Sequence, residues 1–366
     1  MRTLIIGGGV IGTSIAYHLA AKGADVIVIE RSAIACAASG KSGGFLAMDW
    51  CDGTALMHLA RRSFTLHKQL ADEHPGEWGY RRMTTYGGVL RNSSTPASRG
   101  ASPGWLAPEV SIHGQLGSAR TTAQVHPAAF TAGMMRAAQG AKLRLGNVTG
   151  LLCRGGNVVG VDLDGDTLTG DAVVIAMGPW SVLAARWLPL PPVFGLKGHS
   201  LVFETGTAIP SEALFLEYVE ATGSIVSPEV FPRPDGTTYV CAISSNSPLP
   251  TDPGLVVSDD GAIDRLKAIC ARISPMLASS RVLASQACFR PVTEDGLPLI
   301  GAVPGVSGAY LATGHGPWGI LNAPATGEAV AELILDGTTH AVDLSAFNPA
   351  RLEAIDPHRI AVTRGH

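Results

Sequence analysis

The sequence predicts an α/β protein that combines a parallel sheet of the nucleotide-binding Rossmann type with a second domain of the α+β kind, built on a mixed, largely antiparallel sheet. Two observations lead to this prediction. The chain opens with a short apolar strand that passes through a glycine turn into a helix. Residues 191–250 instead hold short alternating strands and the segment PRPDG at 232–236, which is typical of a hairpin turn.

Composition places these sheets in a globular protein. The chain has 366 residues, of which 46% are hydrophobic and 16% charged, so it is able to bury a large core. A net charge of −3, without any run of like charges, offers no basic surface for nucleic acid. The six cysteines form no C-x-x-C pair, so neither a metal site nor a disulfide framework is expected.

No membrane span is expected either. The most apolar stretch, residues 172–196, is interrupted by Gly178, Pro179 and Arg186, so it does not form a regular membrane helix. The first predicted strand begins at Thr3, which leaves no room for a targeting peptide, and a cytoplasmic protein is the expectation. The oligomeric state is left open.

The glycine turn GGGVIG lies between the strand TLII and an apolar-periodic helix. In this motif Gly7 permits the tight turn, Gly9 lets the backbone approach a pyrophosphate, and Gly12 lets the helix pack close to the sheet. The helix N-terminus would face the phosphates. A second predicted strand ends in Glu30, about 20 residues beyond the glycines, where its carboxylate would hold an adenosine ribose and repel a 2′-phosphate. The motif therefore favours NAD or FAD over NADP.

Five further blocks follow the nucleotide motif in a fixed order. They are ASGKSGGFL (38–46), LRLGNV (143–148), AVVIAMGPW (172–180), CFRPVTEDGLPLIG (288–301) and ATGHGPWGILNAPATG (312–327). In content, order and spacing these blocks resemble the D-amino-acid oxidase, glycine oxidase and sarcosine oxidase superfamily of FAD-dependent oxidoreductases. The segments WGYRR (78–82) and WGILNAP (318–324) look more like a branch of that superfamily whose substrates are little characterised.

The resemblance implies FAD as the cofactor and an interleaved pair of domains. The FAD-binding domain would comprise residues 1–78, 120–190 and 289–345, the substrate-binding domain residues 79–119 and 191–288, and residues 346–366 a C-terminal tail. Residues 259–274 have the spacing of an amphipathic helix, which we expect on the substrate domain.

Cofactor contacts follow residue by residue from the matched blocks. In the last block, glycines precede a helix whose free amides would face the N1 and O2 edge of the flavin, where reduction places negative charge. In addition to Gly7, Gly9, Gly12 and Glu30, the expected cofactor-binding residues are Val10, Ile11, Arg31, Ser39, Gly40, Lys41, Gly43, Gly44, Val148, Gly178, Trp180, Cys288, Gly314, Gly316, Trp318, Gly319 and Ile320.

Three side chains are candidates for the substrate site. Arg290 lies where amino-acid oxidases of the superfamily place the arginine that grips the substrate carboxylate; the alternative is a structural arginine that pairs with Glu294 or Asp295. Glu229 takes the place of a substrate-contacting tyrosine of glycine oxidase, and would bind an ammonium or a second cationic group unless it faces solvent. Tyr218, on the preceding strand, is a further candidate for the same pocket.

Other positions bear on the flavin and on oxygen. Cys288 matches a cysteine that carries a covalent flavin in the sarcosine oxidase branch, but its neighbours differ, so non-covalent FAD is expected. That branch also uses a lysine to activate oxygen, and this chain has Val240 there, with Lys41 or Lys197 as possible substitutes. His315 is either a proton relay or a structural histidine.

The resemblance implies that a small amine or amino acid is oxidised to the imine by hydride transfer to flavin N5, with reoxidation by molecular oxygen to give hydrogen peroxide. Two alternatives stay open. One is a dehydrogenase with another electron acceptor, favoured by the missing lysine. The other is a non-catalytic flavoprotein that acts in assembly or trafficking, which the presence of Arg290 disfavours. The sequence does not name the substrate.

Overall fold

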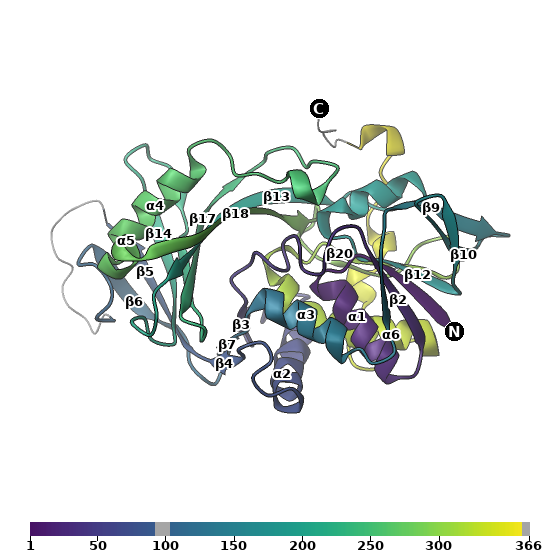
Figure 1. Ribbon diagram of the computed structural model, residues 1–366, viewed down its shortest axis with the longest axis horizontal. Coiled ribbons are helices and arrows are strands. Elements are labelled where there is room, and N and C mark those ends of the chain that lie inside the picture. Colours follow the sequence, from purple (N-terminus) through teal and green to yellow (C-terminus); the bar gives the residue numbers. More distant parts are fainter. Residues whose placement is uncertain (92–102, 361–366) are drawn as a thin grey trace.

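Two large sheets organise the structure, a computed structural model that describes residues 1–91 and 103–360 (Figure 1). The first is a six-stranded sheet at the right of Figure 1, parallel except for its β19–β20 pair. Its strands, in spatial order, are β19 (Leu299–Ala302), β20 (Ala309–Thr313), β12 (Ala172–Ile175), β1 (Arg2–Ile6), β2 (Asp25–Glu30) and β8 (Lys142–Leu145). The predicted parallel sheet of Rossmann type is confirmed.

Successive side chains of each central strand point to opposite faces of this sheet. In β1, Ile5 packs against the helices on one face, whereas Leu4 and Ile6 pack against a small antiparallel sheet on the other. The helices are α1 (Val10–Ala21), α2 (Met57–Glu73), α3 (Pro127–Ala137) and α6 (Gly319–Asp336), and the small sheet consists of β9 (Val148–Arg154), β10 (Asn157–Leu163) and β11 (Asp166–Thr169).

The glycine turn brings α1 close to the sheet. Gly7 has φ 117°, and a Cβ there would lie 2.3 Å from the carbonyl oxygen of Ala176 on the neighbouring strand connection. A Cβ at Gly12 would lie 2.0 Å from the Gly7 carbonyl oxygen. Only glycines allow this approach, so the N-terminus of α1 lies at the carboxyl edge of the sheet, as predicted.

The second large sheet occupies the left of Figure 1 and is antiparallel except for its β5–β14 pair. Its strands, in spatial order, are β18 (Arg281–Val292), β13 (Phe194–Glu204), β17 (Thr237–Ser245), β16 (Glu229–Pro232), β14 (Glu212–Val219), β5 (Thr84–Leu90) and β6 (Val110–Gly117), with β15 (Ile225–Val226) paired to β14. The mixed, largely antiparallel sheet is confirmed, and the PRPDG segment joins β16 to β17 as predicted.

Helix α4 (Ala262–Ile273), followed by α5 (Pro275–Ser279), covers one face of the second sheet (Figure 1). It buries Leu266, Cys270 and Ile273, in agreement with the predicted amphipathic pattern. The opposite face is turned towards the first sheet. A separate three-stranded sheet has the order β3 (Phe45–Ala47), β7 (Thr122–Gln124) and β4 (Arg81–Arg82).

Helix α6 contains Pro324, which lacks the N–H that would bond to the carbonyl of Ile320. Helix α2 supplies the missing donor: Nε2 of His67 donates to that carbonyl at 2.9 Å and to the carbonyl of Leu321 at 3.2 Å. The next amide, that of Ala325, donates to Oγ of Ser63 at 2.9 Å. Two polar side chains of α2 thus stabilise the helix around its proline and fix the position of its N-terminal turn.

The remaining helical turns are short, and they are Gly178–Arg186, Pro253–Leu255, Gly316–Trp318, Ser345–Phe347, Pro349–Arg351 and Pro357–Arg359. Across residues 1–91 and 103–360, no helix combines the length and the apolar character that crossing a membrane requires.

Candidate active site

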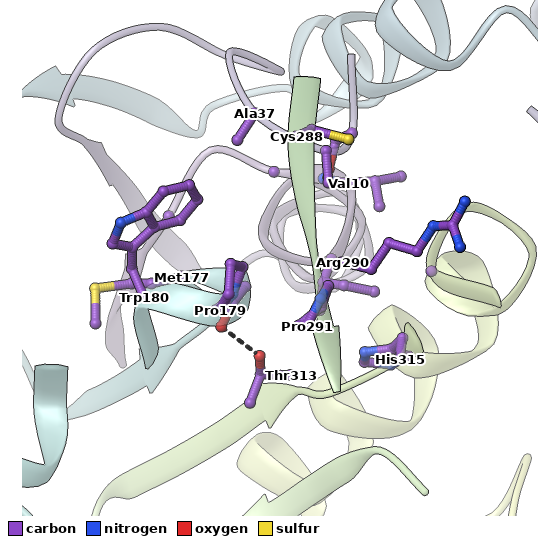
Figure 2. A pocket seen from close by; sticks show the side chains of 18 of the residues that line it. Val10, Ala37, Met177, Pro179, Trp180, Cys288, Arg290, Pro291, Thr313 and His315 are labelled. Atoms are coloured by element: carbon purple, nitrogen blue, oxygen red, sulfur yellow. Dashed lines mark hydrogen bonds between the residues drawn. The ribbon is translucent and has the colours of Figure 1, made fainter. Parts of the chain in front are cut away.

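A cavity of about 710 Å³ lies between the two large sheets. Its walls come from the glycine turn, the end of β2, residues 36–45, strands β13, β17 and β18, and the first turn of α6. Figure 2 shows part of it, with Arg290 and Cys288 on β18 and His315 below them. The volume lies within the range of about 300–1,000 Å³ that is common for small-molecule and cofactor sites.

Most residues predicted from the sequence line this one cavity, although they come from segments far apart in the chain. They are Gly7, Gly9, Val10, Ile11, Glu30, Arg31, Ser39, Gly43, Gly44, Val148, Gly178, Trp180, Cys288, Gly316, Trp318, Gly319 and Ile320, together with Glu229 and Arg290.

One end of the cavity has the donors that a dinucleotide requires. The first helical bond of α1 is donated by Thr13 to Gly9, so the amides of Ile11 and Gly12 have no partner within the helix. The Glu30 carboxylate lies beside them, and its Oε2 accepts a bond of 2.7 Å from the amide of Gly8. Ile11 and Glu30 line the cavity, and a free amide beside a fixed carboxylate fits the pyrophosphate and ribose of FAD.

The other end is formed by the turn that enters α6. Gly316, within this turn, has a positive φ of 55°. At the start of the turn, Thr313 Oγ1 donates to the carbonyl of Gly178 at 2.8 Å, and this hydrogen bond is drawn in Figure 2. His315 Nε2 is hydrogen-bonded to Thr326 Oγ1 at 3.0 Å, and burial lowers the pKa of His315 to about 3. The neutral ring therefore holds the turn in place, which favours its structural role over a proton relay.

The N-terminus of α6 has no side-chain cap, so its first amides are free to face the cavity. This is the arrangement that would stabilise negative charge on a reduced flavin ring. Both ends of the cavity thus fit FAD.

Arg290 extends over the backbone of Gly198 on the adjacent strand β13. A Cβ at Gly198 would lie 3.7 Å from its Nη2, so the absence of a side chain there leaves the guanidinium room. The alternative partner Asp295 is taken by Arg351, whose Nε donates to it at 2.6 Å. Within residues 1–91 and 103–360, Arg290 forms no ion pair, and its fork remains available to a ligand.

Glu229 lies on the neighbouring wall, at the start of β16. Its Oε2 accepts a hydrogen bond of 3.4 Å from the thiol of Cys241. Burial raises the pKa of the Glu229 carboxyl, against the opposing effects of the Arg290 charge and the Cys241 bond. Glu229 and Arg290 are close enough to influence each other, but they are not paired with each other in the part of the chain that the structure describes.

An aromatic cluster borders the same end of the cavity. Trp50 packs against Phe215 with ring centroids 4.8 Å apart and against Trp318 with centroids 6.3 Å apart, and Phe231 packs on Phe215 at 5.4 Å. All four line the cavity. The two charged side chains therefore face a largely apolar, aromatic wall.

The prediction for Tyr218 is wrong. Its side chain lies on the opposite face of the sheet, in the core beneath α4, where its hydroxyl accepts a hydrogen bond from Arg272. The strand alternation that points Tyr218 towards α4 prevents it from reaching the cavity.

Four predicted cofactor residues lie outside the cavity lining because their positions serve packing. They are Gly12, Gly40, Lys41 and Gly314. A Cβ at Gly40 would lie 2.1 Å from the Ala35 carbonyl oxygen, and a Cβ at Gly314, where φ is 78°, would lie 2.7 Å from Thr293. Lys41 Nζ donates to the carbonyl of Ala287 at 3.3 Å. These residues shape the walls without lining the cavity.

The structure also changes the interpretation of Val240, the position matched to the oxygen-activating lysine of the sarcosine oxidase branch. Val240 is fully buried on the α4 face of β17, so even a lysine at this position would point away from the cavity. The residues of β17 that line the cavity are Tyr239 and Cys241. Lys197 pairs with Asp259. Among the described residues, no lysine lines the cavity.

Several lining residues were not identified from the sequence. They are, among others, Trp50, Asn147, Thr149, His199, Phe215, Phe231, Tyr239, Cys241, Thr251 and Pro253. Alternation along β17 was an available signal for Tyr239 and Cys241, because their side chains share one face of the strand. Thr251 and Pro253 lie in a long connection that carries no periodic signal.

The parallel sheet, the glycine turn and a long cavity that ends at a second helix N-terminus define a dinucleotide-dependent oxidoreductase. The family described as DAO, FAD dependent oxidoreductase, matches residues 2–333, and the chain belongs to that family. It is an FAD-dependent oxidoreductase.

Its relatives include proteins of known and unknown activity. The chain is 31% identical to the putative oxidoreductase C1F5.03c of Schizosaccharomyces pombe, over 94% of this chain and 97% of that protein. It is 31% identical to a glycine oxidase of Bacillus licheniformis, over 96% and 98% of the two chains. The crystal structure of glycine oxidase from Geobacillus kaustophilus superposes with a TM-score of 0.80 at 25% identity, covering 96% of this chain and 99% of that one.

Proposed function

We propose that this protein oxidises a small amino acid or amine to the imine, with Arg290 and Glu229 holding the substrate. The observation that carries the proposal is that an arginine and a glutamate line one cavity without pairing with each other. A zwitterionic amino acid matches this pattern, since it presents a carboxylate to the arginine and an ammonium to the glutamate. The similarity to glycine oxidases supports the same substrate class.

Arg290, Glu229 and the aromatic wall each have a separate role in this reaction. Arg290 orients the substrate through its carboxylate, because a planar fork fixes both position and rotation. Glu229 accepts the ammonium proton at its carboxylate, since only the neutral amine lets its carbon release a hydride. The aromatic wall excludes water from both charges. When bound, FAD supplies the hydride acceptor, and the imine product then hydrolyses.

For the electron acceptor, we propose oxygen, with hydrogen peroxide as the product. A dehydrogenase with a different acceptor is the second candidate, and one observation favours it: no lysine lines the cavity among the described residues. A non-catalytic flavoprotein is disfavoured by the availability of Arg290. The domain boundaries given above and non-covalent FAD binding belong to the same proposal.

The test is anaerobic bleaching of the flavin absorbance with a panel of amino acids, N-methyl amino acids and polyamines, followed by air. We expect bleaching by a carboxylated amine and rapid recovery in air; persistent bleaching would indicate the dehydrogenase. Arg290→Leu should raise the Michaelis constant for that substrate about 100-fold, as expected for the loss of a charged hydrogen-bonded partner of ~3 kcal/mol.

The matched control is Arg120→Leu, which removes an exposed arginine outside the cavity and should leave the Michaelis constant unchanged. An Arg290→Leu protein with the wild-type constant would exclude Arg290 from substrate binding. Absence of bleaching with every amine would refute the proposed activity.

A further inference from the structure

Residues 245–259 connect β17 to α4 and form a strap whose two ends are joined. Asp259 accepts hydrogen bonds from Lys197, from Ser245 and from Ser247, and its own amide donates to Nε2 of His199 at 3.0 Å. Although partial burial works in the opposite direction, the hydrogen bonds from Lys197 and the serines lower the pKa of Asp259 to about 2. The base of the strap is therefore fixed to the second sheet.

The tip of the strap crosses to the first sheet. Nη1 of Arg31, which follows β2, donates to the carbonyl of Thr251 at 3.0 Å, and its Nη2 donates to Asp252 at 2.9 Å. Nε1 of Trp180 donates to the carbonyl of Pro250 at 2.7 Å. Three hydrogen bonds thus hold a segment of the substrate-side connection against the nucleotide-binding sheet.

Beneath the tip lies the end of the cavity that contains Glu30 and Val148. Thr251 and Pro253 line the cavity at this end. In a Rossmann-type sheet the end of β2 is where the adenosine lies. Strap residues Leu249 and Val256 also pack in an apolar cluster with Trp180, whereas Leu255 and Val257 are 50% and 69% exposed.

We propose that the strap is the outer wall of the adenosine site, with Thr251 and Pro253 in contact with the adenosine half of the dinucleotide and with Arg31 and Trp180 as positioning residues. The inference rests on the proposed non-covalent binding of FAD. It predicts that the second sheet contributes to cofactor affinity through a segment outside every glycine motif, and that this contribution depends on the adenosine alone.

The test compares FAD with FMN, which has the same flavin but no adenosine. Apoprotein is titrated with each, and binding is followed by quenching of flavin fluorescence. Asp252→Asn keeps the hydrogen-bond acceptor for Gly254 but removes the ion pair with Arg31, and Asp252 itself does not line the cavity. It should raise the dissociation constant for FAD about fivefold, the factor expected for a partly exposed ion pair, and leave that for FMN unchanged.

A second variant, Thr251→Gly with Pro253→Gly, removes the proposed contacts directly and should raise the FAD constant at least tenfold, again without effect on FMN. The matched control is Asp72→Asn, which breaks the exposed Lys68–Asp72 pair on α2. Equal changes for FAD and FMN, or no change for FAD in either variant, would overturn the proposal. A wild-type apoprotein that binds neither flavin would instead refute non-covalent binding of FAD.

Discussion

The bond from His67 to the carbonyl of Ile320 gives a quantitative prediction about α6. His67 is fully buried, and its replacement by phenylalanine keeps an aromatic ring against Phe130, whose centroid lies 4.7 Å away. The substitution removes the donor, while Pro324 still prevents the helix from supplying one. A buried carbonyl without a partner costs about 1–3 kcal/mol, so His67→Phe should destabilise the protein by ~2 kcal/mol.

The same cost should be smaller in a Pro324→Ala background, although the bond from His67 to the carbonyl of Leu321 is lost in either background. Alanine restores the N–H four residues after Ile320, and the helix then satisfies its own carbonyl. The double-mutant cycle should therefore show a coupling of about 1–2 kcal/mol between His67 and Pro324.

The assay is urea unfolding of the FAD-bound wild type, both single variants and the double variant, with His58→Phe as the control on an exposed face of the same helix. A cost of His67→Phe that is the same with proline and with alanine at position 324 would show that the donor role is wrong. In that case the effect of His67 would come from packing and from its bond to the carbonyl of Leu321.

Three further predictions concern buried titratable groups. Glu229→Gln should abolish the acidic limb of the kcat/KM profile, because the wild-type carboxyl, with its pKa raised by burial, must be ionised to accept a proton; an unchanged limb would exclude Glu229 as the base. Burial lowers the pKa of His67 to about 4 and that of His315 to about 3, so the folded state binds fewer protons than the unfolded state below the ordinary histidine pKa of about 6.5. The free energy of unfolding should fall as pH drops from about 6.5 towards 4, by up to about 1.4 kcal/mol per pH unit for each ring, and a flat profile would contradict the neutral assignment. Finally, burial raises the pKa of the Cys288 thiol, so it is poorly suited to attack the flavin; acid precipitation should leave the yellow colour in the supernatant, and colour in the pellet would demonstrate a tether.

The end of the cavity formed by the glycine turns was predictable because its shape depends on the conformation and close approach of the backbone. A close approach such as that of Gly7 to Ala176 excludes every side chain, and a positive φ such as that at Gly316 favours glycine, so both leave a visible mark in the sequence. The positions of Glu30 and of the α6 N-terminus follow from the same regular elements. This explains why widely separated glycine blocks predicted one site.

The end of the cavity that contains Arg290 and Glu229 was predicted less well because it depends on which face of a strand each residue occupies. Tyr218 and Glu229 both appeared to be sheet residues near the pocket, but the register of β14 turns Tyr218 towards α4, whereas Glu229 begins β16 and faces the cavity. A shift of one residue in such a strand exchanges the two faces. Matching Val240 to a lysine position failed for the same reason.

The two ends of the cavity differ in what they contribute to substrate specificity. The backbone-defined end of the cavity would be common to any protein that binds the same dinucleotide, so it carries no information about the amine. Under the proposed function, specificity would come from Arg290, Glu229 and the aromatic residues around Trp50, which are held by strands and by one another rather than by glycine turns. Because Glu229 is buried beside a positive charge and a thiol, its replacement would change which charge the cavity accepts while leaving the FAD-binding end intact. Substitutions at this wall are therefore expected to change the substrate before they affect the cofactor.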